Sequence, residues 1–392
     1  MGPEGGRNPG GMPIPKLIVL GNFLRQRPTG VQRYAIELTR ALAARNPGLV
    51  TLLAPPGVPV PERLSDVPVV FGSCLGTLGR GFPGWAFLDA PAYLNARGVD
   101  GAVVWNPSNI GAPHIPNQVI TLHDLSFYRY PWFFSRRFRY KHKAACAVTL
   151  PRVLGVTTVS QAVRTEIEAR FPFLRGRVDV VYNGVSEHFV RRGRDAVAGL
   201  RLKHGLPERY FLAIGSLDPR KNISALIRAY VDGGVHARTG IGLVLAGGKF
   251  SSFSEDRGLA SLLAQPGVRH LGYVPDDDLP ALYSGCQAFV MPSVYEGFGI
   301  PIIEALACGA PVLCSDIPVF REVGGSRVRY FSPYAPDSLR DALSAACVLA
   351  PDPGNLGGAI AAAFSWDKSA ERFEATLRRF QPARAVEALA QP

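Results

Sequence analysis

The sequence predicts an α/β protein of two Rossmann-like domains, each with a doubly wound parallel sheet, that face a cleft. Short apolar runs of strand length alternate with amphipathic stretches along the chain, and this alternation is typical of βαβ units. The alternation begins again near the middle, at RYFLAIGS (209–216). The length of 392 residues, 47% of them hydrophobic, is ample for two globular domains.

The first half contains a series of predicted strands and one clear helix. The helix is expected over residues 31–46, because apolar residues recur there three and four positions apart. Strands are expected at residues 16–23, 49–54, 101–105, 118–124, 155–160 and 177–184.

The second half repeats this organisation and ends in an amphipathic helix. That helix is expected over residues 365–381, with Ser365 as its N-cap. The strands are expected at residues 209–216, 241–248, 268–274, 287–291 and 311–314. We therefore divide the chain into a disordered tail (1–14), a first domain (15–186), a second domain (187–364) and a C-terminal helix that returns to the first domain (365–392).

The cysteines and the apolar runs limit the class of protein. The six cysteines show no CxxC spacing, so neither a metal cage nor a disulfide framework is expected, and reduced thiols suit a cytoplasmic protein. No N-terminal run resembles a signal peptide, and no apolar stretch approaches the roughly 20 residues that a membrane span needs.

The formal net charge of +12 favours an anionic partner. Cations and aromatic residues are densely mixed in FYRYPWFFSRRFRYKHK (127–143). This mixture suits a membrane interface, and it equally suits an ordinary basic helix whose aromatic residues lie in the core. Nucleic acid is not expected as a partner, because no known recognition module surrounds the segment.

The segment YEGFGIPIIEA (295–305) is the first candidate site. It lies between two apolar runs, and Pro301 and Gly309 suit the start and the end of a helix over 300–308. Glu296 then follows a strand and Glu304 lies in the first turn or so of the helix, at the sheet edge where ligands bind. Two glycines on either side of a phenylalanine leave backbone N–H groups open to a ligand.

The segment GSLDPRKN (215–222) is the second candidate site. Asn222 is the expected N-cap of a helix over 223–231, so Arg220 and Lys221 lie at its positive end. Either a bound anion compensates these cations or they form a solvated surface pair. Cations from one loop and acids from the other together suit a phosphate ester that carries a hydroxyl-rich sugar.

Nearly the whole chain, from about residue 16 to residue 380, resembles the retaining glycosyltransferases of family 4, which have the GT-B fold. The most specific match is the E-x7-E element in YEGFGIPIIEALACGAPV (295–312). Further matches are GSLDPRKN, LGYVPDDDLPALY (271–283), VVYNGV (180–185), TLHDLSFYRYP (121–131) and TGVQRYAIELTRAL (29–42). The resemblance is nearest to bacterial mannosyltransferases of O-antigen and exopolysaccharide assembly.

The resemblance implies roles for the acids and cations of the second domain. Glu304 would bind the ribose hydroxyls of the nucleotide. Glu296 would accept a hydroxyl of the donor sugar, next to the N–H groups of Gly297, Phe298 and Gly299. Arg220 and Lys221 would bind the diphosphate.

The resemblance also implies further contacts. Gly215 would belong to the donor site, and the main chain at Tyr273 and Val274 would meet the base. From the acceptor domain, Gly30 would approach the diphosphate and His123 would contact the transferred sugar. One departure is Gln32, where this family frequently has a further glycine.

The implied reaction is metal-independent transfer of a hexose with retention, by front-face displacement and without a cofactor. GDP-mannose is the first candidate donor, followed by UDP-hexoses and dTDP-rhamnose. The acceptor is a saccharide or a lipid-linked sugar. The expected location is the cytoplasm, with peripheral contact to the inner membrane through residues 127–143 left open.

Other classes of protein fit less well. An NAD-dependent enzyme needs GxGxxG after an early strand, and GNFLRQRPTG (21–30) lacks it. A sugar-nucleotide epimerase, a phosphorylase on the same fold and a silent lipid-binding scaffold remain as alternatives. The run of acids at 276–278 imitates a metal-binding DxD motif, but helix capping explains it better.

Overall fold

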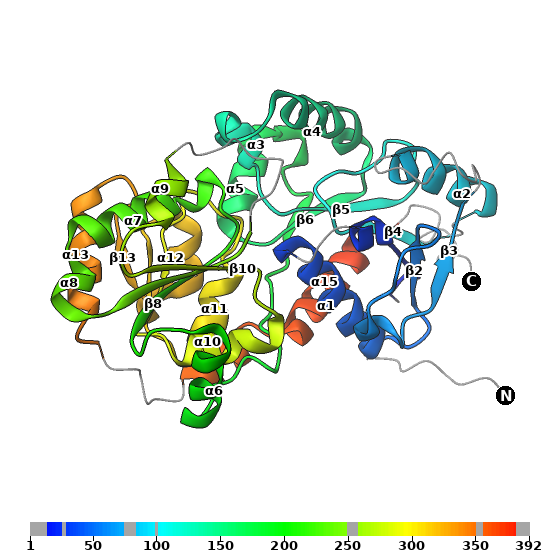
Figure 1. The fold of residues 1–392 in the computed structure, drawn as a ribbon. Coiled ribbons are helices and arrows are strands. Elements are labelled where there is room, and N and C mark those ends of the chain that lie inside the picture. The colour runs from blue at the N-terminus through cyan, green and yellow to red at the C-terminus, as the bar shows by residue number, and fades with distance from the viewer. Residues whose placement is uncertain are drawn as a thin grey trace. The chain divides into compact units, whose positions relative to one another are not determined.

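The computed structural model describes residues 14–25, 29–73, 84–98, 101–248, 258–349 and 356–381. The predicted disordered tail lies outside these residues, apart from Ile14. The chain forms two parallel sheets, one of seven strands in the order β3-β2-β1-β4-β5-β6-β7 and one of six in the order β10-β9-β8-β11-β12-β13 (Figure 1). In each sheet the order reverses around the first strand, as doubly wound folds require. The predicted pair of sheets is confirmed.

The first sheet contains all six predicted strands and one more. Its strands are β1 (Leu17–Leu20), β2 (Val50–Ala54), β3 (Val69–Phe71), β4 (Val103–Asn106), β5 (Gln118–Leu122), β6 (Gly155–Thr158) and β7 (Val178–Val180). The unexpected strand, β3, has three residues, of which none is fully buried, at the edge of the sheet. Its three apolar residues (VVF) form a run shorter than the four to eight residues by which a strand is recognised in a sequence.

The second sheet contains the five predicted strands and, again, one unexpected edge strand. Its strands are β8 (Tyr210–Ile214), β9 (Gly242–Ala246), β10 (Val268–Gly272), β11 (Ala288–Met291), β12 (Val312–Ser315) and β13 (Arg329–Phe331). The central strands β9, β11 and β12 are buried at every position, because helices cover both faces of a parallel sheet.

Helices connect the strands. In the first half of the chain they are α1 (Gly30–Arg45), α2 (Ala90–Arg97), α3 (Ser126–Arg129), α4 (Arg136–Thr149), α5 (Gln161–Arg170) and α6 (Arg194–His204). In the second half they are α7 (Ile223–Asp232), α8 (Val235–Thr239), α9 (Leu259–Leu263), α10 (Leu279–Ser284), α11 (Ile300–Ala307), α12 (Pro318–Gly324), α13 (Pro336–Ala346), α14 (Leu356–Ala363) and α15 (Trp366–Arg379). Among the described residues, no helix is long and apolar enough to cross a membrane.

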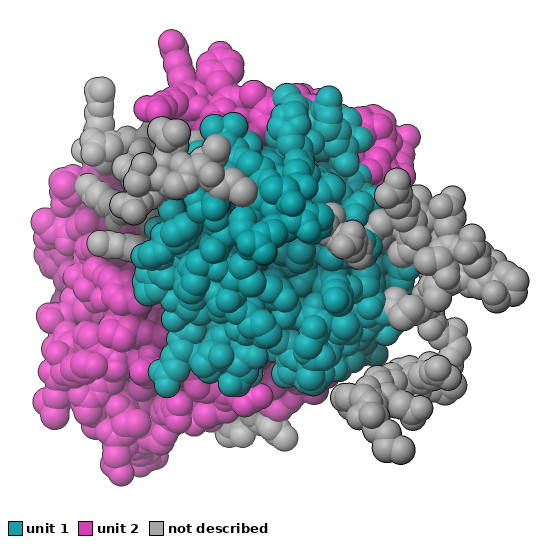
Figure 2. Space-filling view, turned by 90° about the vertical axis from the view of Figure 1, so that its right-hand side faces the viewer, with its two compact units in different colours: residues 1–121, 148–157, 370–392 teal, residues 122–147, 158–369 magenta. Residues whose placement is uncertain are grey.

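The chain divides into two compact units, coloured teal and magenta in Figure 2. Unit 1 consists of residues 1–121, 148–157 and 370–392, and unit 2 consists of residues 122–147 and 158–369. The two units group residues that pack together, whereas the predicted domains were drawn around the two predicted sheets. The expected domain boundaries therefore stay a prediction.

The C-terminal helix α15 begins where the sequence indicates. The Ser365 hydroxyl accepts a hydrogen bond from the Lys368 N–H at 3.2 Å, which confirms the predicted N-cap. Further along the helix, the Phe373 ring lies 4.7 Å from the Trp105 ring, and Glu374 accepts a hydrogen bond from Arg45 Nε at 2.8 Å. Unit 1 thus contains the end of α15 packed against α1 and β4.

Candidate functional site

Two loops of unit 2 meet at the carboxyl edge of the second sheet. One follows β8 and carries Arg220 and Lys221, and the other follows the neighbouring strand β11 and carries Glu296. The Val294 N–H donates to the Arg220 carbonyl at 2.9 Å, which joins the loops. Lys221 Nζ lies 2.5 Å from Glu296 Oε1, and Arg220 Nη1 lies 3.7 Å from Glu296 Oε2. Three of the predicted site residues therefore form one ionic cluster.

Two further carboxylates complete this ionic cluster. Asp124 Oδ2 accepts a hydrogen bond from Arg220 Nη1 at 3.1 Å, and Asp218 Oδ1 lies 3.7 Å from Arg220 Nε. Three carboxylates face two cations, so the cluster carries an excess of one negative formal charge. In this structure carboxylates, rather than the bound anion considered above, compensate the cations at the positive end of the helix.

Burial and charge set the ionisation of the cluster. Burial works against the charged guanidinium of Arg220, but the surrounding carboxylates hold its pKa above the ordinary value. Burial also favours the neutral form of Glu296, yet Lys221 and then Arg220 outweigh it, and the pKa of Glu296 lies below its ordinary value. Glu296 is therefore a carboxylate at neutral pH, a strong hydrogen-bond acceptor inside the protein.

The loop that carries the cations is shaped by local hydrogen bonds. Asp218 Oδ1 accepts from the Arg220 N–H at 3.0 Å, and this bond starts a short 3₁₀ turn. Asn222 occupies the N-cap position of α7, as predicted, but its side chain makes no cap bond. Its backbone is left-handed (φ 55°), and the side chain donates to the Pro333 carbonyl at 3.3 Å. The prediction that the Asn222 side chain caps α7 was wrong. Asn222 instead takes the left-handed conformation that ends the 3₁₀ turn before α7.

The glycine-rich loop packs tightly against His123. A Cβ atom on Gly297 would lie 2.1 Å from the His123 carbonyl oxygen, so no larger residue fits there. Gly299 is left-handed, with φ 105°, and stands directly before α11. Gly297 is thus required by the neighbouring backbone, a reason different from the ligand approach that the sequence suggested. Among the described residues, none bonds the N–H groups of Gly297, Phe298 and Gly299.

The remaining predicted residues take other positions. Glu304 is the fifth residue of α11, which begins at residue 300 as predicted; it is 3% exposed and accepts a hydrogen bond from the Tyr283 hydroxyl at 3.0 Å. After β10, Tyr273 is exposed and Val274 is buried. Gly215 is left-handed, at φ 152°, and the aliphatic part of Lys221 lies directly beside its Cα.

Gly30 belongs to unit 1, where it is the first residue of α1. The unusual Gln32 has a structural role there. Its side-chain oxygen accepts from the backbone N–H of Thr29 at 3.1 Å and from the Thr29 hydroxyl, which forms a capping box.

A buried tyrosine next to Glu296 is a feature that the sequence analysis missed. The Tyr295 hydroxyl donates to Glu166 Oε2 at 2.6 Å and accepts from the Leu125 N–H at 3.0 Å. Burial raises the pKa of Glu166, and the bond from Tyr295 opposes this rise. Tyr295 and Glu166 therefore fix the loop of Glu296 against α5 and against the segment that carries Asp124. A buried hydroxyl between two partners leaves no periodic signal in a sequence.

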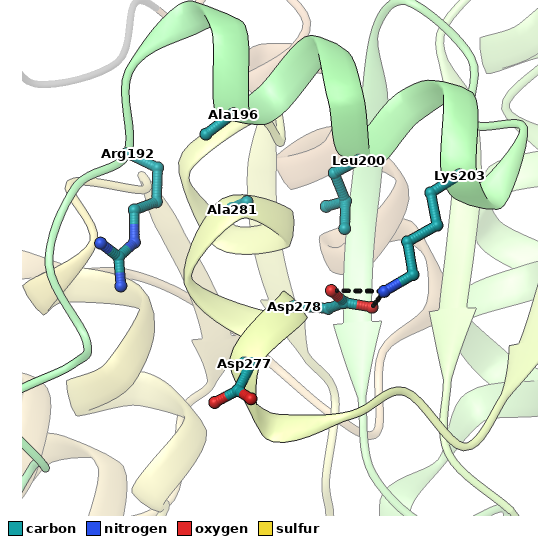
Figure 3. Close-up of a pocket in the computed structure, with 7 residues that line it drawn as sticks. All are labelled: Arg192, Ala196, Leu200, Lys203, Asp277, Asp278 and Ala281. Atoms are coloured by element: carbon teal, nitrogen blue, oxygen red, sulfur yellow. Dashed lines mark hydrogen bonds and ion pairs between the residues drawn. The ribbon is translucent and has the colours of Figure 1, made fainter.

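The acids at 276–278 lie apart from this cluster. Asp278 accepts hydrogen bonds from Lys203 Nζ at 2.8 Å and from His204 Nε2 at 2.8 Å. It lines a cavity of about 300 Å³ between α6 and α10. Arg192 and Asp277 also belong to this lining (Figure 3). Asp278 thus stands at the N-cap position of α10 and in a first turn of acids, as expected, but its side chain makes no cap bond and binds basic side chains instead. No group of three side chains suited to a metal ion occurs among the described residues.

Replacement of Lys221 by methionine tests the charge balance of the cluster. The pKa of Glu296 is lowered from 4.5, so its ionisation stabilises the fold above about pH 4.5, and this contribution is lost as the pH falls through the folded value. Without Lys221 the folded pKa rises. The free energy of unfolding should drop by about 3–5 kcal/mol at pH 7 and by clearly less at pH 4. Urea unfolding at both pH values measures this difference.

Lys203→Met is the matched control, because Lys203 also pairs with an aspartate but its side chain is 57% exposed. Its cost should stay within about 0–1 kcal/mol. An equal loss for Lys221→Met at pH 4 and pH 7 would contradict the assignment of Glu296 as the buried partner.

A double-mutant cycle tests the bond between Tyr295 and Glu166. Tyr295→Phe should cost about 1–3 kcal/mol of unfolding free energy, because the half-buried carboxylate of Glu166 and the buried N–H of Leu125 both lose a partner. With Glu166→Gln in the background the cost should fall, with a coupling of about 0.5–3 kcal/mol. Tyr230→Phe, whose hydroxyl bonds backbone carbonyls, is the control and should show no coupling to Glu166→Gln in urea unfolding.

Both halves of the chain match models of known families. Residues 28–189 match the model described as Glycosyltransferase Family 4, and residues 201–349 match the model described as Glycosyl transferases group 1. The first match spans β2 to β7 and includes Asp124, and the second spans the glycine-rich loop and the other members of the ionic cluster.

Two curated relatives are mannosyltransferases by name. The O-antigen chain mannosyltransferase B of Escherichia coli is 31% identical over 329 residues, which cover 79% of this chain and 84% of that protein. The O-antigen chain mannosyltransferase RfbU of Salmonella typhimurium is 32% identical over 234 residues, which cover 59% of this chain and 61% of that protein.

The fold has solved neighbours as well. The sucrose-phosphate synthase of Thermosynechococcus elongatus superposes with a TM-score of 0.70 over 96% of this chain and 100% of that chain, at 19% identity. This likeness supports the GT-B fold, and the relatives and family models support the activity. The chain therefore belongs to the family 4 glycosyltransferases.

Proposed function

We propose that the chain transfers a mannosyl group from GDP-mannose to a saccharide or lipid-linked acceptor in the synthesis of a bacterial O-antigen polysaccharide, with retention of configuration. The printed names of the two relatives support mannose as the transferred sugar and the O-antigen as the product. The observation that carries the proposal is the buried cluster of Arg220, Lys221 and Glu296 at the edge of the second sheet.

In the proposed reaction, atoms of the bound donor replace the hydrogen-bond partners that the residues of this cluster have in the free protein. Lys221 Nζ turns from Glu296 to an oxygen of the diphosphate, and Arg220 Nε, a buried donor without a hydrogen-bond acceptor among the described residues, supplies a second contact. Glu296 then accepts a hydrogen bond from a hydroxyl of the mannosyl group. These exchanges place positive charge where the diphosphate departs, and preorganised charge of this kind stabilises a transition state.

The bond changes are balanced without a protein nucleophile. The bond between the anomeric carbon and the diphosphate oxygen breaks, and the acceptor oxygen forms a bond to the same face of that carbon. The proton of the acceptor hydroxyl goes to the departing phosphate oxygen. Side-chain cations and backbone N–H groups carry the charge of the leaving group, so the proposed mechanism needs no metal ion.

The other predicted residues receive proposed roles in the same scheme. Glu304 binds the ribose hydroxyls by exchanging its bond from Tyr283, and the main chain at Tyr273 and Val274 meets the guanine base. His123 contacts the mannosyl group, and Gly30 approaches the diphosphate. Gly215, which has no side chain, leaves room for the aliphatic part of Lys221. Residues 15–186 serve as the acceptor domain and residues 187–364 as the donor domain.

The isosteric change Glu296→Gln tests the proposed role of the cluster. The amide keeps the size of the side chain but loses the charge that strengthens the bond to the sugar hydroxyl. We expect kcat/KM for mannosyl transfer from GDP-mannose to fall about 10- to 150-fold, the equivalent of 1.5–3 kcal/mol. Transfer to a mannose oligosaccharide, followed by mass spectrometry, gives the rates.

Asp278→Asn is the matched control, because Asp278 is also a lysine-paired carboxylate of unit 2 but lies outside the cluster. It should change kcat/KM less than threefold, within the roughly 0–1 kcal/mol of an exposed ion pair. UDP-glucose and dTDP-rhamnose serve as competing donors. Faster transfer from either would overturn the choice of GDP-mannose, and equal losses in both variants would count against Glu296.

We also propose that the basic segment 127–143 brings the enzyme to the cytoplasmic face of the inner membrane. Within it Phe127 and Phe134 are buried, so part of its aromatic content belongs to the core. Arg136, Arg137 and Tyr140 are exposed on α4. Exposed cations beside an exposed aromatic ring are suited to anionic lipid headgroups.

The double change Arg136→Glu and Arg137→Glu tests this membrane contact. Each cation near an anionic surface contributes about 1 kcal/mol, so the loss of two should weaken binding to phosphatidylglycerol-containing vesicles at least about 30-fold. Arg175 and Arg177, which lie outside the segment, provide the control through Arg175→Glu and Arg177→Glu. Vesicle co-sedimentation at two salt concentrations measures the binding of both double variants. Equal losses of binding in the two would contradict the assignment of this segment as the membrane contact.

A further inference from the structure

Five aromatic rings of unit 2 form a connected cluster beside the ionic cluster, and we call it the aromatic platform. Its centre is Tyr130, whose ring lies 5.5 Å from Phe133 (stacked, 9°), 5.6 Å from Trp132 (edge-on, 79°) and 5.4 Å from Tyr295. The Tyr130 and Tyr334 hydroxyls lie 3.2 Å apart. The platform thus joins the loop after β11, the loop after β13 and the segment between α3 and α4.

The platform runs from the buried site to the solvent. Tyr295, at its inner end, is 7% exposed and directly precedes Glu296. Trp132 and Tyr334, at its outer end, are 63% and 69% exposed. Exposed apolar surface that is gathered in one patch marks an interaction site more often than singly exposed rings do. The outer end therefore presents apolar ring surface and two phenolic hydroxyls a short way from the residue proposed to hold the donor sugar.

We infer that the aromatic platform is the acceptor subsite, where Trp132 and Tyr334 hold sugar residues of the growing oligosaccharide while its terminal hydroxyl lies beside the departing phosphate oxygen of the donor. The inference rests on the proposed function and extends it to the acceptor. A hexopyranose has an apolar face of C–H groups and a rim of hydroxyls. The exposed rings can pack against the C–H face of the sugar, and the phenolic hydroxyls can form hydrogen bonds with its hydroxyls.

The chemistry of the platform favours a saccharide over a lipid bilayer. Burial and the hydroxyl of Tyr334 raise the pKa of Tyr130 to about 12, so its hydroxyl stays neutral and can both donate and accept. The exposed cations suited to lipid headgroups, Arg136 and Arg137, lie on α4 and form no part of the platform. Continuity through Tyr295 links the platform to the ionic cluster, whereas a bilayer contact needs no such link.

Tryptophan fluorescence gives a direct test in the full-length protein. Of the four tryptophans, Trp85, Trp105 and Trp366 are buried and Trp132 is the exposed one. A short α-linked mannose oligosaccharide should shift the emission to the blue by covering the Trp132 indole, and Trp132→Phe should abolish the shift. Vesicles of phosphatidylglycerol and phosphatidylethanolamine are the second probe. A shift with vesicles and none with the oligosaccharide would make the platform a membrane contact and overturn the inference, as would no shift with either.

Kinetics with GDP-mannose give an independent readout. Trp132→Ala should raise the KM for the oligosaccharide about three- to tenfold, which corresponds to one aromatic contact, with kcat changed less. Trp132→Phe should restore most of the affinity. Phe173→Ala is the matched control, because Phe173 is an aromatic residue of unit 2 that is 50% exposed outside the platform. An unchanged KM in Trp132→Ala would overturn the inference.

The failure of this inference can be told apart from a failure of the proposed function. Thermal stabilisation of the wild-type protein by GDP and GDP-mannose depends on the donor site and is measured without any oligosaccharide. If GDP-mannose stabilises the protein but the oligosaccharide causes no fluorescence shift, the proposed donor stands and the proposed role of the platform is wrong. Binding of the oligosaccharide without stabilisation by GDP or GDP-mannose keeps the platform and removes the proposed donor.

Discussion

The candidate site depends on the burial of two cations among three carboxylates. A buried charge is stable only when it is paired, and the loss of one partner costs several kcal/mol. Arg220 is held from three sides, by Asp124, Asp218 and Glu296, and these acids come from three different segments of the chain. The ionic cluster therefore fixes the loops after β8 and β11 and the end of β5 in one arrangement, and every other feature of the site is attached to these loops.

Close backbone packing supports the same arrangement. Gly297 lies against the His123 carbonyl, and the Ser160 hydroxyl donates to the Gly297 carbonyl at 2.8 Å. The carboxylate of Glu322 on α12 accepts from the N–H groups of Gln161 and Ala162 at 2.7 and 3.0 Å, which caps α5. With the bond from Tyr295 to Glu166, helix α5 is thus held at its first turn and at its middle. The glycine-rich loop has little freedom to move without α5.

Much of the fold and part of the site could be predicted from the sequence. Apolar periodicity, Pro301 and Gly309 predicted the central strands, α1, α11 and the position of the two loops at one sheet edge. The ion pair between Lys221 and Glu296 was not predicted, because the sequence analysis assigned both side chains to a ligand. Family membership favours a transferase over the epimerase, phosphorylase and scaffold alternatives. The edge strands β3 and β13 were not predicted because each has only three residues, fewer than a recognisable strand pattern needs. Asp124 and Glu166 escaped because their partners are distant in sequence, and such pairing depends on tertiary structure. Asn222 was assigned a cap bond from propensity alone, and its left-handed backbone overrides that preference.

The excess negative charge of the ionic cluster has a consequence for the order of events. In the proposed reaction a diphosphate would meet three carboxylates as well as two cations, so its binding would be stronger when Glu296 gains a hydroxyl partner at the same time. A nucleoside diphosphate without a sugar supplies the phosphates but not that hydroxyl. If it draws Lys221 away, the buried Glu296 loses this ion pair and gains no new partner. The complete nucleotide sugar satisfies both requirements. In this scheme the site discriminates in favour of the intact donor, and loss of the sugar by transfer weakens the hold on the product. Charge pairing of this kind links product release to the chemical step.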